Sequence, residues 1–161
     1  MKSIEATLRL ALHDDVPAIE DIVRAAYTHY ISVIGRKPGP MLDDYTVLVA
    51  NDRVFVAEMS GTVRGILVLI PQDDAMLLDN IAVAPPAQGQ GLGKYMLQFA
   101  ENVSVKRGYS AIRLYTHEMM IENISLYKRI GYFETHRVEE KGLRRVYMLK
   151  RLSIQRIWLE S

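Results

Sequence analysis

The sequence contains no cysteine. Disulfides, thiolate metal sites and a cysteine nucleophile are therefore excluded. If the protein transfers a chemical group, it must use another nucleophile or pass the group directly between two bound substrates. Direct transfer is the simpler hypothesis.

The sequence also lacks an excess of either charge and any long apolar segment. It has 20 Lys and Arg residues and 19 Asp and Glu residues, and 49% of its residues are hydrophobic. This balance does not give the basic field of a nucleic-acid-binding protein or the composition of a disordered chain. No stretch approaches the ~20 apolar residues of a membrane span, and the N-terminus has no apolar signal-peptide core. We therefore expect a soluble, cytoplasmic protein with neither nucleic acid nor membrane as a partner.

The first third of the chain predicts one strand and two helices. Alternating apolar residues indicate a strand over residues 6–12. Apolar residues then recur at steps of three and four over residues 16–30, and Gly35 stops this pattern. Residues 41–51 are shorter and mixed, and we interpret them as a second helix.

The middle of the chain predicts a hairpin, a central strand and a helix. The runs 54–57 and 65–70 are apolar or β-branched and are joined across Ser60-Gly61. Residues 76–83 are mostly apolar, which predicts a strand covered on both faces near the middle of the sheet. A helix with a buried stripe follows over residues 92–103.

The last third predicts a strand, a helix and two further strands, over residues 111–115, 121–130, 133–138 and 146–152. The whole pattern predicts one α+β domain over residues 4–152, with one mixed, mostly antiparallel sheet. Residues 153–161 form a C-terminal extension that carries the only tryptophan, Trp158. Because its apolar residues need cover, we expect a homodimer.

A glycine-rich turn, Gln88-Gly89-Gln90-Gly91-Leu92-Gly93-Lys94, separates the central strand from the helix that follows. Glycines let the backbone approach a ligand closely, and the start of a helix favours negative charge. The turn is therefore a candidate cradle for phosphate, with Lys94 as a cation and Gln88 as a donor at its rim. The alternative is a tight turn without a ligand.

Two common nucleotide-binding motifs do not fit this turn. A Walker loop would need Ser or Thr after its lysine, but Lys94 is followed by Tyr95. A Rossmann fingerprint would need G-x-G-x-x-G in a parallel β-α-β unit, which the preceding hairpin contradicts.

The sequence instead resembles the GNAT superfamily of N-acetyltransferases. Gln88 to Gly93 match the family's acyl-CoA signature, Gln/Arg-x-x-Gly-x-Gly/Ala, at every position. The segment from Asn123 to Tyr132 is similar to the family's second conserved segment, which has an Asn and a Tyr on a helix followed by Gly-aromatic. The resemblance implies a sheet of about seven strands with about four flanking helices, splayed at the acyl-CoA site. It also implies acetyl-CoA as the acyl donor, and no metal.

The resemblance assigns residues to the cofactor. Backbone groups of the central strand would pair with the pantetheine arm, and one main-chain N–H would face the thioester oxygen, a contact worth ~3 kcal/mol of barrier. The implied cofactor-binding residues are Ile81, Ala82, Val83, Gln88, Gly89, Gln90, Gly91, Leu92, Gly93, Lys94 and Asn123.

The resemblance also suggests catalytic residues. Tyr127 lies four residues after Asn123 and is the candidate general acid that protonates the departing CoA thiolate. Asp79 is the one carboxylate on the strand before the turn and is the candidate base for the amine. His117 and Glu118 are second candidates for the base.

Substrate contacts in the family come largely from the region between the first two helices and from the last hairpin. The implied substrate-binding residues are Tyr27, Tyr30, Met41 and Tyr147, with Ile34, Arg36 and Arg145 nearby. The expected reaction is direct acetyl transfer to a primary amine, either a small amine or a peptide amine. Two alternatives stay open: a non-catalytic acyl-CoA sensor of the same fold, and acetylation of a protein N-terminus or lysine.

Overall fold

A computed structural model describes residues 4–153, which form two compact units: residues 4–69 with 79–99, and residues 70–78 with 100–153. Seven strands are hydrogen-bonded in the order β1-β2-β3-β4-β5-β7-β6. The β4–β5 pair is parallel, whereas the β1–β2, β2–β3, β5–β7 and β6–β7 pairs are antiparallel. The predicted α+β class, the mixed sheet and the central place of β4 are confirmed.

The first unit contains a meander whose strands are β1 (Thr7–Leu10), β2 (Val54–Met59), most of β3 (Thr62–Pro71) and the second half of β4 (Met76–Val83). The predicted hairpin is confirmed, because β2 and β3 pair antiparallel across Ser60 and Gly61. Both turn residues have positive φ, at 53° and 77°. Such a turn follows the twist of the strands that it joins.

The helices of the first unit differ from the sequence-based prediction. The single helix expected over residues 16–30 is two helices, α1 (Val16–Tyr27) and α2 (Tyr30–Ile34). At the break the Thr28 hydroxyl bonds to the Arg24 carbonyl, and the Ile31 N–H bonds to the carbonyl of Thr28 at 3.1 Å. This tighter i to i+3 bond interrupts the α-helical ladder.

The second predicted helix is also shorter than expected. Residues 39–42 form a 3₁₀ turn (Gly39–Leu42), and α3 (Tyr45–Ala50) starts where the Asp44 carboxylate accepts the Val47 N–H at 3.3 Å. The described residues therefore contain five α-helices in place of about four.

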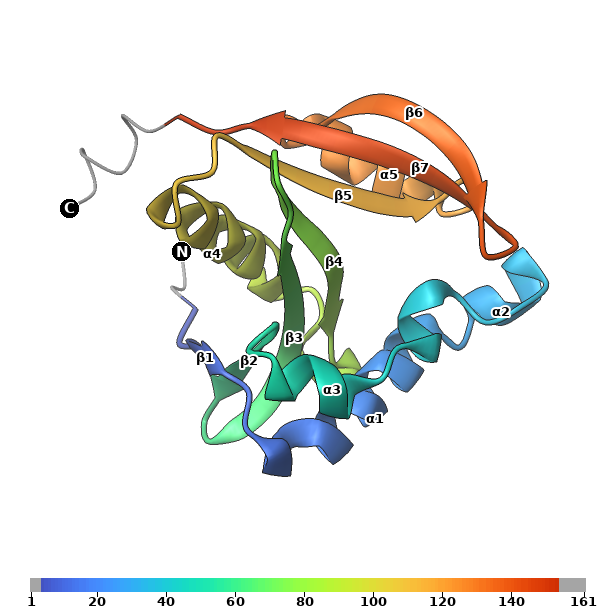
Figure 1. The fold of residues 1–161 in the computed structure, drawn as a ribbon. Helices are drawn as coiled ribbons and strands as arrows, with labels where there is room; N and C mark the ends of the chain where they lie inside the picture. The colour runs from blue at the N-terminus through green and yellow to red at the C-terminus, as the bar shows by residue number, and fades with distance from the viewer. Residues whose placement is uncertain (1–3, 154–161) are drawn as a thin grey trace. The chain divides into compact units, whose positions relative to one another are not determined.

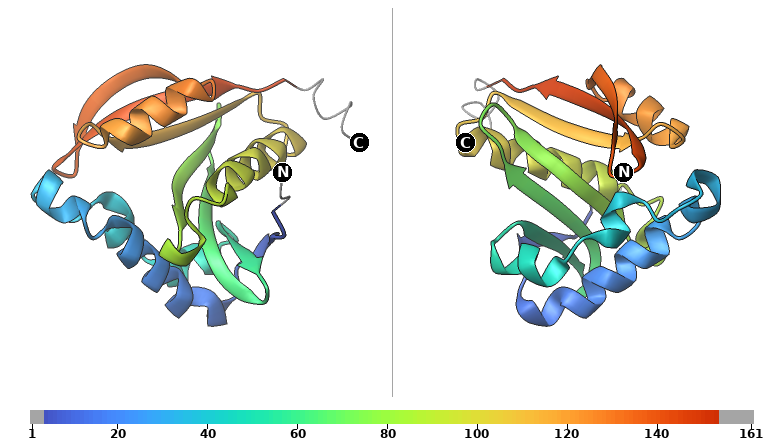
Figure 2. Two further views of the ribbon diagram at one scale, coloured as in Figure 1. Left: turned by 180° about the vertical axis from the view of Figure 1, so that it is seen from behind. Right: turned by 45° about the vertical axis from the view of Figure 1, so that its right-hand side comes forward.

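Helices cover both faces of the meander in the first unit (Figure 2). The first half of α4 (Leu92–Lys106) lies on one face, and α1 and α3 lie on the other. Phe55 of β2 meets Phe99 of α4 edge to face, with ring centroids 5.1 Å apart. A Cβ on Gly65 would lie 2.7 Å from the Met96 Sδ, so a larger residue there would require the Met96 side chain to move.

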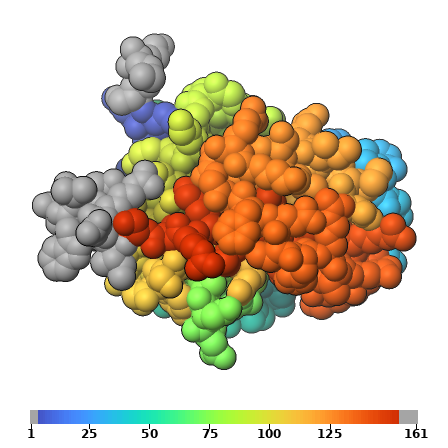
Figure 3. Space-filling model, turned by 90° about the horizontal axis from the view of Figure 1, so that it is seen from above, coloured from blue at the N-terminus to red at the C-terminus, as the bar shows by residue number. Residues whose placement is uncertain are grey.

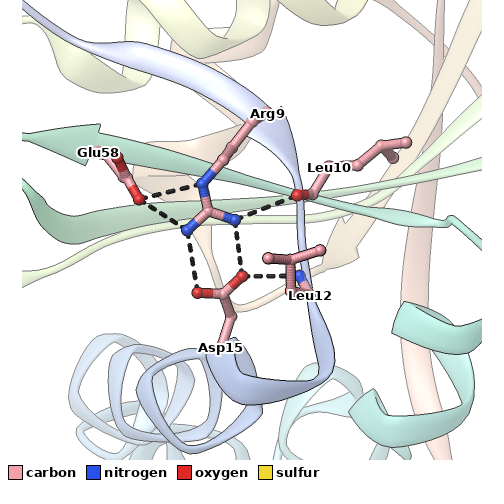
Figure 4. Close-up of polar contacts among 5 residues, drawn as sticks. All are labelled: Arg9, Leu10, Leu12, Asp15 and Glu58. Atoms are coloured by element: carbon pink, nitrogen blue, oxygen red, sulfur yellow. Dashed lines mark hydrogen bonds and ion pairs between the residues drawn. The ribbon is translucent and has the colours of Figure 1, made fainter.

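One arginine joins three parts of the first unit (Figure 4). Arg9 of β1 donates to Asp15 at 2.7 and 3.1 Å and to Glu58 of β2 at 2.7 and 3.0 Å. The Asp15 carboxylate also accepts the Leu12 N–H at 2.7 Å. The Arg9 guanidinium holds the pKa of Asp15 below its usual range. This cluster ties the edge strand to the start of α1.

Asp15→Asn should lower the free energy of unfolding at pH 7 by about 1–3 kcal/mol, because a partly buried charge-assisted pair loses its anion. Since the folded-state pKa of Asp15 is depressed, its contribution is complete above the unfolded-state pKa of about 3.9. It is lost as the pH falls through the lower folded-state pKa. Urea titrations from pH 7 to 3 check this. A gap between variant and wild type that stays constant over that range would contradict the assignment.

The second unit contains β5 (Ala111–His117), α5 (Ile121–Arg129), β6 (Phe133–Glu140) and β7 (Leu143–Arg151) (Figure 1). All four elements were predicted, and β5, β6 and β7 begin or end a few residues further out. Lys141 and Gly142 form the turn between β6 and β7, with positive φ at both residues. β7 pairs with β5 on one side and β6 on the other, and α5 lies against one face of these strands.

A buried ion pair lies within the second unit. The Lys150 Nζ of β7 is 3.1 Å from both carboxylate oxygens of Glu101, on the last part of α4. The Glu101 side chain is 8% exposed and that of Lys150 is 20% exposed. The Tyr132 hydroxyl is buried beside this pair, and burial raises its pKa.

The expected extension, apart from Ser153, lies outside the described residues, and the homodimer prediction rests on it.

Candidate functional site

The glycine turn follows the 3₁₀ turn Pro85–Ala87 and leads into α4. Gly89 and Gly91 have φ of 78° and 86°, a conformation that favours glycine, whereas Gly93 is already helical. The Gln88 side chain donates to the Val83 carbonyl at 3.1 Å, so it fastens the turn to the end of β4. The first N–H groups of a helix have no partner within the helix.

These features suit a phosphate group. The segment from Gln88 to Lys94 has two left-handed glycines, the start of a 15-residue helix, one lysine and no carboxylate. At Gly91 a Cβ would come within 3.1 Å of Ile4 Cδ1, so a side chain there would crowd the turn. The donor set fits a pyrophosphate, because helix N-termini and aligned backbone N–H groups bind anions.

The end of β4 differs from the predicted strand with two covered faces. Met76, Leu77 and Leu78 are buried and pair with β5, as expected. From Asp79 to Val83 burial alternates: Asn80 and Ala82 are 4% and 5% exposed, whereas Asp79, Ile81 and Val83 are half-buried. One face of this stretch is therefore open in part. It is the face that carries Asp79, the candidate base.

A chain of hydrogen bonds in the first unit, buried at Asn80 and Tyr45 and partly buried at Tyr27, joins α1, β4 and α3. The Tyr27 hydroxyl lies 2.6 Å from Asn80 Oδ1 and 3.1 Å from the Ile81 carbonyl oxygen. Asn80 Nδ2 donates to the Tyr45 hydroxyl at 3.0 Å, which donates to the Pro40 carbonyl at 2.5 Å. The hydroxyl of Tyr27, a predicted substrate residue, thus forms its hydrogen bonds with β4. Tyr45 was not predicted as a site residue, although an Asn within an apolar strand is a signal for such a partner.

A pocket of about 170 Å³ lies beside this chain of bonds, within the first unit. Its lining mixes apolar, aromatic and charged side chains: Glu20, Val23, Arg24, Lys37, Met41, Asp43 and Tyr45. Met41, a predicted substrate residue, is one of the residues that line this pocket. Burial raises the pKa of Tyr45, and Asp43 adds to the effect. The Tyr30 ring packs on His29, with ring centroids 3.9 Å apart.

The second unit holds the candidate acid. Tyr127 of α5 is 8% exposed, and its ring meets that of Tyr132 edge to face with centroids 5.6 Å apart. Asn123, one turn earlier, is half-buried, and its Nδ2 contacts Met120 Sδ at 3.7 Å. The ring of Tyr127 therefore packs on Tyr132, which follows α5.

The two alternative base candidates have partners within the second unit. His117 Nδ1 accepts the Met119 N–H at 3.1 Å, and burial lowers the pKa of the imidazole. Both effects favour the neutral ring with its proton on Nε2. Glu118 pairs with Arg144 at 3.2 Å and lies 3.9 Å from Arg137.

The last hairpin carries a compact polar and aromatic cluster. The Tyr147 hydroxyl and the Arg145 guanidinium donate to Glu140 Oε2 at 2.8 and 2.9 Å. The bond from Tyr147 and then that from Arg145 hold the pKa of Glu140 below its usual range. Tyr147 stacks on His136 with ring centroids 4.6 Å apart, and Arg145 lies 4.2 Å above the ring of Tyr115. Figure 3 shows a face of the molecule where residues of β6 and β7 are at the surface.

Within residues 4–153, no group of three His, Cys, Asp or Glu side chains is placed to hold a metal ion. Over the same residues, no helix has the length and apolar content needed to cross a membrane.

The sequence matches the Acetyltransferase (GNAT) family over residues 16–132, from the start of α1 to Tyr132 after α5. The chain belongs to this family. The match includes β4, the glycine turn and the helix that carries Tyr127. Membership confirms the resemblance found in the sequence.

Several named proteins are similar to this chain. N-acetyltransferase 8B from Homo sapiens is 23% identical over 126 residues, which are 74% of this chain and 56% of that protein. The chain thus spans about half the length of that relative. PaiA N-acetyltransferase from Thermoplasma acidophilum, solved in complex with coenzyme A, is 15% identical with a TM-score of 0.74 over 92% of this chain and 99% of that one. YncA from Salmonella typhimurium, solved with its cofactor acetyl-CoA, is 20% identical with a TM-score of 0.68 over 93% and 95% of the two chains.

Proposed function

We propose that the protein transfers the acetyl group of acetyl-CoA directly to a primary amine in a ternary complex. The observation that carries this proposal is the glycine turn at the start of α4. Its residues Gln88 to Gly93 match the acyl-CoA signature at every position, and its two left-handed glycines and the helix start give it an anion-binding geometry. The absence of cysteine from the sequence supports direct transfer, because no thiol is present to hold the acyl group.

The residues of the first unit would hold the cofactor. Backbone N–H groups of Gly89 to Lys94 would bind the pyrophosphate, and Lys94 would add a charge-assisted contact. The backbones of Ile81, Ala82 and Val83 would pair with the pantetheine arm, and Asn123 of the second unit is the further contact that the family resemblance implies. When bound, acetyl-CoA supplies an activated acyl group with a thiolate leaving group.

Two side chains would move protons in the reaction. An alkyl ammonium has a pKa near ~10, so the amine must lose a proton before it attacks. Asp79, on the partly open face of β4, would accept that proton directly or through water. Tyr127 would donate its phenolic proton to the departing sulfur.

The acceptor would be a small amine or the amine of a peptide. Tyr27, Tyr30 and Met41 belong to the segment that borders the pocket of the first unit, and Tyr147 belongs to the polar cluster of the last hairpin. A mixture of aromatic, carboxylate and cationic side chains suits an amine that carries polar groups. Acetylation of a protein N-terminus or lysine is the same chemistry with a larger acceptor.

Acetyl-CoA should raise the melting temperature, because a ligand that binds only the folded state stabilises it by mass action. Gly91→Val should abolish this shift, since it adds a branched side chain at φ 86° in the proposed pyrophosphate cradle. Gly108→Val is the matched control: Gly108 has φ 90°, lies outside the turn, and its variant should keep the shift at a lower melting temperature.

Thermal shift and isothermal titration with acetyl-CoA make this measurement, and release of CoA thiol with a panel of amines and peptides tests turnover. If Gly91→Val stays folded and binds acetyl-CoA with wild-type affinity, the glycine turn is not the binding site. Binding without CoA release for any amine in the panel would favour the acyl-CoA sensor.

A further inference from the structure

The hydrogen-bond chain through Asn80 has only one consistent direction. The Tyr45 hydroxyl has one proton, which it donates to the Pro40 carbonyl, so it must accept from Asn80 Nδ2. This contact fixes the orientation of the Asn80 amide and turns Oδ1 toward Tyr27. The Tyr27 hydroxyl must then be the donor. Each group thus determines the next one.

The chain of bonds connects two ends of one segment to one side chain. Tyr27 is the last residue of α1 and Tyr45 is the first residue of α3, so residues 28–44 are fastened at both ends to Asn80. This segment carries Tyr30 and Met41 of the proposed acceptor site. Asn80 immediately precedes Ile81, and the Tyr27 hydroxyl is also 3.1 Å from the Ile81 carbonyl.

Burial makes these bonds costly to break. Asn80 and Tyr45 are each 4% exposed, so an amide or hydroxyl that lost its partner would have little access to water. In such surroundings a connected polar chain favours one arrangement over its alternatives, whereas apolar packing alone tolerates small shifts.

We propose that Asn80 is a positioning residue that sets the acceptor segment 28–44 in register with the Ile81 backbone. This inference rests on the proposed function, because it assigns that segment to the acceptor and that backbone to the acyl donor. Tyr27 and Tyr45 act through Asn80. Loss of either hydroxyl releases the acceptor side and leaves the glycine turn unchanged.

The test compares Tyr27→Phe, Tyr45→Phe and the double variant. Tyr109→Phe is the control, because it also removes one phenolic hydroxyl and lies before β5, outside the chain of bonds. Each single variant should lower kcat/KM for the acceptor about tenfold, with the Kd for acetyl-CoA within about twofold. The double variant should be hardly worse than either single variant, because both break the same chain. Tyr109→Phe should change neither quantity.

Hydrogen exchange of the ligand-free proteins provides a readout that does not depend on turnover. Either single variant should speed amide exchange both in residues 28–44 and in residues 80–84, at a temperature where all variants are folded. The inference would be overturned if a single variant sped amide exchange only in the peptide that contains the mutated residue. It would also be overturned if the losses in kcat/KM of the two single variants added up in the double variant. A wild-type protein that fails to bind acetyl-CoA would instead contradict the proposed function, and the exchange data would still decide the role of Asn80.

Discussion

Tyr127→Phe should lower kcat by 10²- to 10⁴-fold, the range typical of a general acid. The substitution keeps the ring that packs edge to face on Tyr132, so the protein should stay folded. Acetyl-CoA affinity should stay within a few-fold, because most of the proposed binding groups are backbone groups of the first unit. The loss should therefore fall in kcat and leave the Kd for acetyl-CoA nearly unchanged.

Steady-state kinetics with an acceptor from the amine panel measures this effect, and calorimetry measures the Kd for acetyl-CoA. Tyr109→Phe serves as the control, since it removes a phenol from the same unit outside the proposed site. If Tyr127→Phe retains wild-type turnover, another residue or water protonates the sulfur, and Tyr127 contributes packing alone.

Lys150→Met should lower the free energy of unfolding by about 3–5 kcal/mol, because it leaves the Glu101 carboxylate buried without its cation. The Lys150 Nζ contacts both oxygens of that carboxylate at 3.1 Å, and only 8% of the Glu101 side chain is exposed. The double variant Glu101→Gln/Lys150→Met should recover much of the loss, because no uncompensated charge remains.

Urea unfolding of the wild type and the two variants checks the ion pair. Arg113→Met provides a comparison, because it breaks a pair with Asp74 whose side chain is 70% exposed, and solvent screens such a pair. Equal stability losses for Lys150→Met and Arg113→Met would show that burial of the Glu101 pair has no special cost.

Local patterns allowed most of the fold to be predicted from the sequence. Glycines and short polar pairs marked the turn at Ser60-Gly61, the end of α5 at Gly131 and the cradle at Gly89 and Gly91, because positive φ restricts the choice of residue. The break between α1 and α2 was missed because helical spacing continues across it. The bond of the Thr28 hydroxyl and the tighter bond from Ile31 to Thr28 mark the interruption.

Contacts between distant residues set the limit of that prediction. Tyr45 and Asn80 are 35 positions apart, and Arg9 and Glu58 are 49 positions apart, so no local period indicates either pair. The start of α3 at its Asp44 cap was not predicted, because the segment before it is mixed. Tyr127 and Asp79 stay predictions, since their roles depend on a bound substrate.

The position of β7 has a consequence for how the second unit folds during synthesis. β7 is translated after β5 and β6, yet it separates them in the sheet. Until Leu143–Arg151 leave the ribosome, β5 and β6 each lack a neighbour, and a chain at that stage exposes unpaired backbone groups. Ribosome-bound chains that end before Leu143 should therefore resist protease poorly around β5 and α5. Protection should appear in one step when β7 becomes available.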